Sequence, residues 1–196
     1  MRFGSKLGQM ARLGFALVAT LASLQLTTAA ARAGSKTAAL PVSVTVNTDC
    51  NISTTIVAFG SPSVYSALTV AATQGQGAIT LTCTKGSAPV VALDKGANFA
   101  SATRNMKNTD PTTTDLLAYN LYQPSATTPN AACAYTTAWG DAGTTITGAK
   151  FTPSGAVGIA TSNTYNVCAT INPGQDVTAS VASLSYKDTV TATVTF

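Results

Sequence analysis

The sequence predicts an all-β sandwich, and three observations carry that prediction. Short runs rich in Val and Thr recur along the chain, a composition typical of pleated, half-buried strands. Turn residues separate these runs, as in GSPS at Gly60, QGQG at Gln74 and NPGQ at Asn172. No helical period of useful length follows Ala33. Many short strands divided by turn signals indicate a sandwich.

The individual strands are predicted from the alternation of apolar and polar residues, which places every second side chain on one face. The predicted strands are Leu40–Val46, Cys50–Phe59, Ala78–Thr84, Pro89–Leu93, Leu116–Tyr122, Thr144–Phe151, Asn163–Ile171 and Tyr186–Phe196. The polar stretch from Gly96 to Thr114 has no such alternation and is predicted to be a loop. Its cation Arg104, with Lys95 and Lys107, is expected on a solvated rim.

The first and last predicted strands have the clearest apolar faces. The face of the first consists of Leu40, Val42, Val44 and Val46. The face of the last consists of Tyr186, Val190, Ala192, Val194 and Phe196, and Asp188 is its one charge. Such a face must be covered by another layer of structure.

A leader precedes the predicted sandwich. A basic n-region is followed by the apolar run Leu13–Leu26 and by Ala31-Arg32-Ala33, a small-residue cleavage site. These are the features of a secretory signal peptide over residues 1–33. A membrane anchor is the alternative, but the apolar run is shorter than the roughly 20 residues that a span requires.

Removal of the leader changes the charge of the chain. The full sequence has 11 Lys and Arg, 7 acidic residues and a net charge of +4. Four of the basic residues (Arg2, Lys6, Arg12 and Arg32) lie in the leader, so seven remain against seven aspartates. The mature chain is therefore neutral, and we expect no nucleic-acid partner because phosphate neutralisation needs excess basic charge. Near-neutral surfaces resist self-association poorly, which favours an assembly component.

Cysteine usage indicates an oxidising compartment. Cys50, Cys83, Cys133 and Cys168 all remain after cleavage, and an even count in an exported chain predicts two disulfides. Three pairings are open; sequence neighbours, Cys50–Cys83 and Cys133–Cys168, are favoured. Zinc is the rival use, but it prefers closely spaced cysteine pairs that this chain lacks.

Catalytic chemistry has few candidate residues. The sequence contains no His and no Glu, which removes the usual general base and most transition-metal ligands. QGQG feeds a strand and not a helix, the wrong context for phosphate binding. We expect no catalytic residue, no metal, no cofactor, no small-molecule substrate and no enzymatic activity.

Several motifs, in order, resemble the spore coat protein U domain family. They are VSVTVNTDCNIS from Val42, Phe59-Gly60, GAITLTCTKG from Gly77, Arg104-Asn105-Met106, LAYNLYQ from Leu117, AWGD from Ala138, PGQ from Pro173 and the terminal SYKDTVTATVTF. The resemblance spans Leu40 to Phe196. Before PGQ the chain departs from the family pattern, since it reads YNVCATINPGQ.

The resemblance implies a fold and a mechanism. The family includes pilin subunits of archaic chaperone–usher pili, which have an immunoglobulin-like sandwich that lacks its final strand. In such pilins a periplasmic chaperone first supplies a strand, and at an outer-membrane usher the N-terminal segment of the next subunit replaces it. The implied organisation is a signal peptide (1–33), a donor-strand segment (34–47) and a pilin domain (48–196). Leu40, Val42, Val44 and Val46 then serve as donor plugs, and Val190, Ala192, Val194 and Phe196 line the groove that faces the chaperone.

Other interpretations remain open at this point. Leu40–Val46 could instead be an ordinary first strand of the same domain, as in a self-contained coat protein. Trp139 and Tyr135 could stack against a sugar in an adhesin, although a lone Trp in a sandwich more often packs internally. The expected role is a structural subunit of a secreted surface pilus that supports attachment and biofilm formation.

Overall fold

The computed structural model describes residues 34–60, 72–154, 161–179 and 185–196. The predicted signal peptide, residues 1–33, lies outside the described residues. Residues 34–43 belong to a separate unit from Val44–Phe196, and each of them is exposed. No strand occurs between residues 34 and 49, so the prediction of a strand over Leu40–Val46 was wrong for this chain alone: the segment pairs with no described strand. Across the described ranges, no helix is long and apolar enough to cross a bilayer.

The described elements of Val44–Phe196 are strands, which confirms the all-β prediction. In chain order they are β1 (Cys50–Ala58), β2 (Thr73–Cys83), β3 (Val90–Leu93), β4 (Arg104–Asn108), β5 (Leu116–Pro124), β6 (Cys133–Ala138), β7 (Asn163–Ile171), β8 (Tyr186–Lys187) and β9 (Ala192–Thr195).

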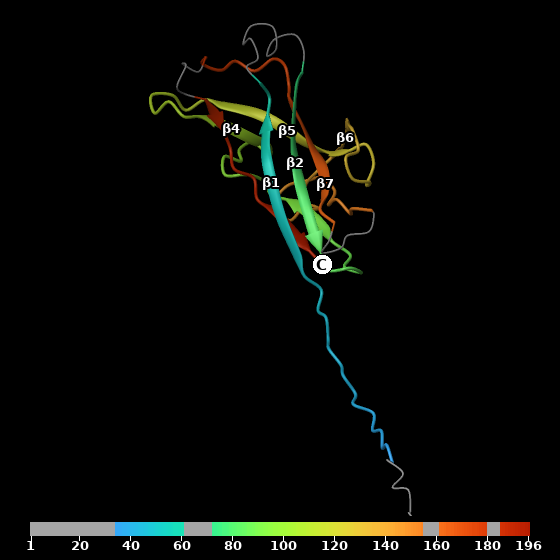
Figure 1. The fold of residues 1–196 in the computed structure, drawn as a ribbon. Coiled ribbons are helices and arrows are strands. Elements are labelled where there is room, and N and C mark those ends of the chain that lie inside the picture. Colours follow the sequence, from blue (N-terminus) through green and yellow to red (C-terminus); the bar gives the residue numbers. More distant parts are fainter. Residues whose placement is uncertain (1–33, 61–71, 155–160, 180–184) are drawn as a thin grey trace, which may run out of the picture. The chain divides into compact units, whose positions relative to one another are not determined.

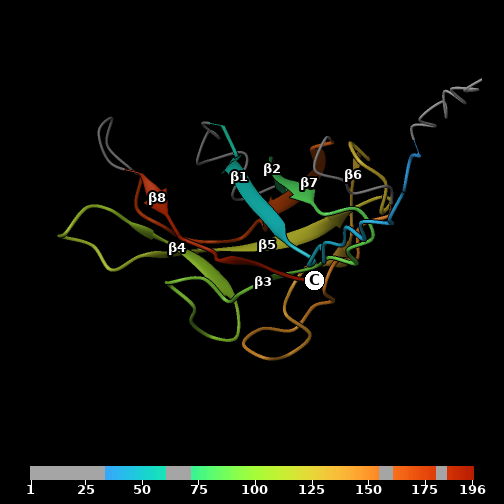
Figure 2. The same cartoon turned by 60° about the horizontal axis from the view of Figure 1, so that its bottom comes forward.

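The strands form two antiparallel sheets (Figure 1). The larger sheet has the order β1-β2-β7-β5-β4-β8, with β6 paired to β5, and the smaller sheet consists of β3 and β9. Strands β1 and β8 are the two edges of the larger sheet. Figure 2 shows the path of the C-terminal segment: β8 lies beside β4, and the chain then continues past β3 to its end.

The core is built from the inward faces of both sheets. Fully buried side chains include Ile79 and Leu81 of β2, Val91 of β3 and Tyr165 of β7. Trp139, directly after β6, is also fully buried, and its indole N–H donates to the Val91 carbonyl at 3.0 Å. Buried inward residues alternate with more exposed outward ones along β2, as is typical of a sandwich, whereas β7 is buried on both faces from Val167 to Ile171.

The predicted last strand, Tyr186–Phe196, was expected to be continuous and is not. Its first part, β8, pairs with β4 in the larger sheet, whereas β9 pairs with β3 in the smaller one. Between them, the Asp188 carboxylate accepts hydrogen bonds from the Tyr119 hydroxyl and from Asn98. The segment changes sheets at this point because its polar side chain is held by loop and core donors.

Two further predictions were wrong, and β6 was not predicted. The stretch Gly96–Thr114 contains β4, whose buried side chains are the polar Arg104, Asn105 and Asn108 and so give no apolar alternation. Residues 144–151 form no strand apart from isolated bridges. Here the Asp141 carboxylate accepts from the backbone N–H groups of residues 145 and 146, which folds the segment into turns. Most side chains of β6 are exposed, so it carries no burial pattern either.

Candidate functional site

An open groove separates the two free edges of the sandwich. It lies between β1 on one side and residues 186–192, from β8 to the start of β9, on the other, and its volume is about 430 Å³. The groove-side edge of β1 pairs with no described strand, and neither does that of β9. We call this space the edge groove. Its floor is apolar and consists of Ala78, Ile79, Leu93, Met106, Leu121 and Val167.

The β1 side of the core is open to solvent. Thr54 lies opposite Ile79 in the β1–β2 register and therefore shares its inward face. Ile79 is only 1% exposed, yet Thr54 is exposed. An inward-facing position that solvent reaches indicates that a layer of covering structure is missing above it.

The β9 side is open in the same way. Ala192 and Val194 share a face with Leu93 and Val91, their register partners in β3. The two β3 side chains are buried, but the two β9 side chains are only partly so. Val190, which lines the edge groove just before β9, is also partly buried.

Backbone hydrogen-bonding groups on this side also have no partner among the described residues. The Thr191 carbonyl accepts from the Asp94 N–H at 3.1 Å, on the side of β3. Since successive residues of a strand direct their N–H and C=O groups to alternate sides, those of Val190, Ala192 and Val194 point toward the edge groove. A row of such groups is a template for another strand.

Of the predicted C-terminal site residues, the structure brings only some to the groove. Val190 and Ala192 line it. Val194 packs against the core cluster, and Phe196 follows β9, with 46% of its surface exposed. Neither of the last two is among the groove-lining residues.

A polar network crosses the edge groove at Asp188, between Lys187 and Thr189 of its C-terminal wall. The Tyr119 hydroxyl donates to Asp188 Oδ2 at 2.6 Å, and Asp188 Oδ1 accepts from the backbone and side-chain nitrogens of Asn98 at 3.0 Å each. Burial, together with the hydrogen bond to the Asp188 carboxylate, raises the pKa of Tyr119 well above its ordinary value. The phenol therefore stays protonated and acts as a fixed donor.

Arg104 was expected on a solvated rim and is instead buried. Only 3% of it is exposed, and its guanidinium donates to three carbonyl oxygens, those of Asp94 at 2.8 Å, Leu93 at 2.9 Å and Trp139 at 3.0 Å. Burial lowers the pKa of Arg104, and neighbouring carboxylates oppose that effect. The Arg104 side chain thus links β4 of the larger sheet to the end of β3 in the smaller one. Lys95 and Lys107, in contrast, are exposed as predicted.

The predicted donor residues are the most exposed large apolar side chains of the described chain, together with Ile56. Their exposed fractions are 85% for Leu40, 87% for Val42, 86% for Val44 and 70% for Val46. These side chains alternate along an extended segment without strand pairing. The apolar face that the sequence predicts is thus exposed in the described residues.

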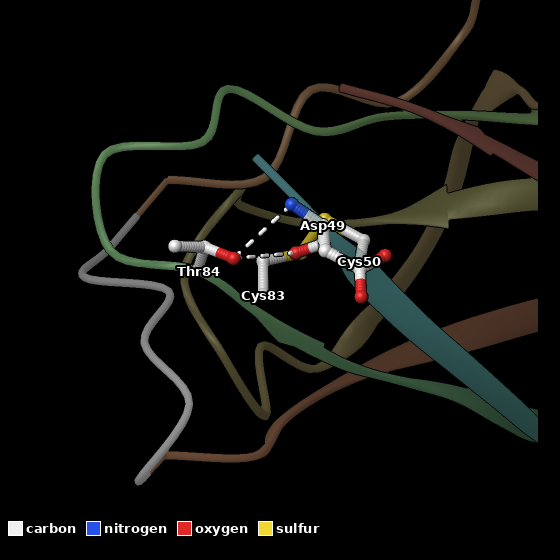
Figure 3. Close-up of a disulfide and its surroundings, with 4 residues drawn as sticks. All are labelled: Asp49, Cys50, Cys83 and Thr84. Atoms are coloured by element: carbon white, nitrogen blue, oxygen red, sulfur yellow. Dashed lines mark hydrogen bonds between the residues drawn. A yellow bond between two sulfur atoms is a disulfide. The ribbon is translucent and has the colours of Figure 1, made fainter. Parts of the chain in front are cut away.

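Both disulfides are present, and they join sequence neighbours: Cys50 to Cys83 and Cys133 to Cys168. Figure 3 shows the first, which links the start of β1 to the end of β2. Beside it, the Asp49 N–H donates to Thr84 Oγ1 at 3.1 Å, and the Thr84 N–H donates to the Asp49 carbonyl at 2.8 Å. These contacts fix the start of β1, the edge strand of the groove.

The aromatic pair considered for sugar binding does not form a site. Trp139 is fully buried, and its ring packs at 4.9 Å from that of Phe151. Tyr135 contacts Tyr122 instead, edge to face at 6.2 Å. Stacking of a sugar on Trp139 is therefore excluded by its burial. No cluster of three or more potential metal ligands occurs within the described ranges.

Comparison with known proteins agrees with the motifs. The family model of the Spore Coat Protein U domain matches residues 36–193. Curated proteins gave no match. Among solved structures, one similar chain comes from the CsuC–CsuE chaperone–tip adhesion subunit pre-assembly complex of the archaic chaperone–usher Csu pili of Acinetobacter baumannii, with 20% identity and a TM-score of 0.48. That match covers 78% of this chain and 41% of the other, so this chain spans less than half of its length. Because the family model covers most of its residues, the protein belongs to the spore coat protein U domain family.

Proposed function

We propose that this protein is a structural subunit of a surface pilus, in which residues Leu40–Val46 of one copy fill the edge groove of the next. We call Leu40–Val46 the donor segment. The observation that carries the proposal is a match between two exposed features: an alternating apolar segment without a partner and a sandwich whose interior is open along one edge. Family membership supports it, since pilins of this family complete their fold in this way.

The dimensions of the two features agree. The donor segment covers six residue steps, roughly 20 Å of extended chain. Residues 190–196 of the C-terminal segment, which include those with free main-chain groups, cover the same number of steps. The donor backbone would bond to the free main-chain groups of Val190, Ala192 and Val194, and its alternate side chains would enter the apolar interior, as in other cases of strand addition.

The contact would be head to tail and would not close on itself. Each subunit offers one donor segment and one groove, which are different surfaces, so repetition of the contact generates a fibre. Each Val or Leu side chain that enters the groove contributes about 1.5–3 kcal/mol from burial alone. This is the energetic reason for assembly.

The proposed function also includes the export of the subunit and the location of the pilus. A cleaved leader over residues 1–33 would deliver the chain to the periplasm, where both disulfides can form. There a chaperone would occupy the groove until an usher exchanged it for the next subunit. The assembled pilus would lie at the cell surface and support attachment and biofilm formation. The proposed role is structural and non-enzymatic.

The test uses two variants that each lose one half of the contact. Val44→Asp puts a carboxylate on the donor face and leaves the groove intact. Thr54→Arg places a long cation in the groove and leaves the donor intact. Both positions are exposed, so neither change disturbs the folded chain. Thr45→Asp, on the opposite face of the donor segment, is the matched control.

We expect each variant alone to remain unassembled and the control to polymerise. An equal mixture of the two variants should form a one-to-one pair. Size-exclusion chromatography with light scattering measures all three results. The loss of valine burial and the cost of burying a charge together exceed about 4 kcal/mol, or roughly a thousandfold in affinity. A self-contained coat protein predicts no mixed pair. Normal polymerisation of the Val44→Asp variant would exclude Leu40–Val46 as the donor.

A further inference from the structure

The second half of β1 differs from the first, and a bulge is the cause. From Cys50 to Thr54, the even-numbered residues of β1 face inward opposite β2. The register shifts between Thr55 and Ala58, and beyond this bulge the partly buried side chains are Val57 and Phe59. A bulge of one residue reverses which side chains face inward and bends the strand.

Two buried glycines in β2 make room for this bend. A Cβ at Gly75 would lie 2.6 Å from a ring carbon of Phe59 and 2.9 Å from the Ala58 carbonyl oxygen. A Cβ at Gly77 would lie 2.8 Å from a methyl group of Val57. The QGQG sequence therefore lets β1 lean over the inward face of β2, where any other residue would hold it off.

The bend carries Phe59 across the interior. Strands β2 and β7 lie between β1 and β5 in the sheet order, yet the Phe59 ring packs edge to face against Tyr119 of β5, with ring centroids 6.4 Å apart. Tyr119 is the residue whose hydroxyl binds Asp188. All three residues line the edge groove, and we call them the cross wall.

We propose that the cross wall is a stop that fixes how far a donor strand extends along the groove, and that Phe59 is the residue that positions it. This inference rests on the proposed function. Along the chain, the open position Thr54 precedes Phe59, and Val190 and Ala192 follow Asp188, whereas Tyr186 and Lys187 line the groove before Asp188. The donor segment would occupy the part of the groove beside Thr54, Val190 and Ala192. At the wall, a further apolar side chain would meet the Phe59 ring and the hydrogen-bonded Asp188 carboxylate instead of an empty site. The donor segment ends its apolar alternation after Val46 with Asn47 and Thr48, as a groove of limited length requires.

The test compares two peptides on the full chain carrying Val44→Asp, whose own donor is disabled and whose groove is intact. The first peptide has the sequence of residues 38–48. The second carries two extra residues, Val-Thr, after Val46 and so offers one more apolar plug. Both peptides are titrated by calorimetry against the Val44→Asp chain and against the same chain with one added substitution. The added substitutions are Phe59→Ala, Phe59→Leu and, as a matched control on the outward face of β1, Ser53→Ala.

We expect the wild-type groove and the Ser53→Ala groove to bind the longer peptide no more tightly than the shorter. Phe59→Ala should admit the extra valine and favour the longer peptide by about tenfold, the value of one buried valine. Phe59→Leu, which keeps an apolar side chain at the wall, should show a smaller preference and remains informative if the alanine variant does not fold.

The outcomes separate the two proposals. A longer peptide that binds about tenfold more tightly to the wild-type groove overturns the stop, as does a Phe59 variant that folds normally and shows no new preference. In both cases binding of the shorter peptide still supports strand addition. If neither peptide binds to any of the proteins, the proposed function fails and the stop fails with it.

Discussion

Removal of the Arg104 guanidinium should destabilise the protein more than any change on its surface. The side chain donates hydrogen bonds to the carbonyl oxygens of Leu93, Asp94 and Trp139 and is only 3% exposed. Arg104→Met keeps the length of the side chain and removes all three donors. Each buried carbonyl left without a partner costs about 1–3 kcal/mol, and relief from burying a charge offsets part of this.

The expected net loss is about 3–5 kcal/mol, a large share of the roughly 5–15 kcal/mol that stabilises a typical domain. Urea unfolding followed by tryptophan fluorescence measures it directly. The sequence contains one Trp, and it is the buried Trp139, whose own carbonyl accepts one of the three bonds. Lys150→Met, at an exposed position, is the control and should change stability little.

A free energy of unfolding for Arg104→Met within about 1 kcal/mol of the unmodified protein would refute the reasoning. It would mean that water or a rearranged loop satisfies the three carbonyls at little cost. An equal loss in the Lys150→Met control would likewise show that the effect does not come from the carbonyl contacts.

Two further predictions concern pH and redox state. Burial and the hydrogen bond to Asp188 raise the pKa of Tyr119 above its ordinary value of 10.0. The protonated phenol therefore stabilises the folded state fully below about pH 10. This contribution is lost as the pH rises further, by up to roughly 1.4 kcal/mol per pH unit. Tyr119→Phe should flatten the fall in unfolding free energy above about pH 10; an unchanged slope would contradict this. Replacing both Cys133 and Cys168 with serine should cost up to about 3.5–4 kcal/mol, because their separation of 35 residues sets the loop entropy. Thermal unfolding checks it, and an unchanged midpoint would rule out a stabilising role for that disulfide.

The alternation of residue types predicted much of the fold. The strand Asn163–Ile171 was predicted with its observed bounds, and Cys50–Phe59 and Pro89–Leu93 differ from β1 and β3 by one residue each. These segments bury one face, and burial of every second residue produces an alternation of apolar and polar residues in the sequence. Strand β4 shows no such alternation in the sequence because, of its inward residues, Arg104 and Asn108 are polar and only Met106 is apolar.

The candidate site, like the fold, was predictable from the sequence only in part. The apolar faces at the two ends of the chain and the four cysteines are visible in the sequence, because each is a local pattern of residue types. Three features depend on the tertiary structure: the open edge beside Thr54, the crossing of Phe59 over Gly75 to Tyr119, and the burial of Arg104. Each arises from contacts between strands that are distant in sequence, and alternation carries no information on which edges meet. The sequence by itself thus determined that this chain has an apolar-faced segment near each end, and only the tertiary structure decided that a groove remains open between β1 and the C-terminal segment, since that depends on how the sheet curls and where its edges stop.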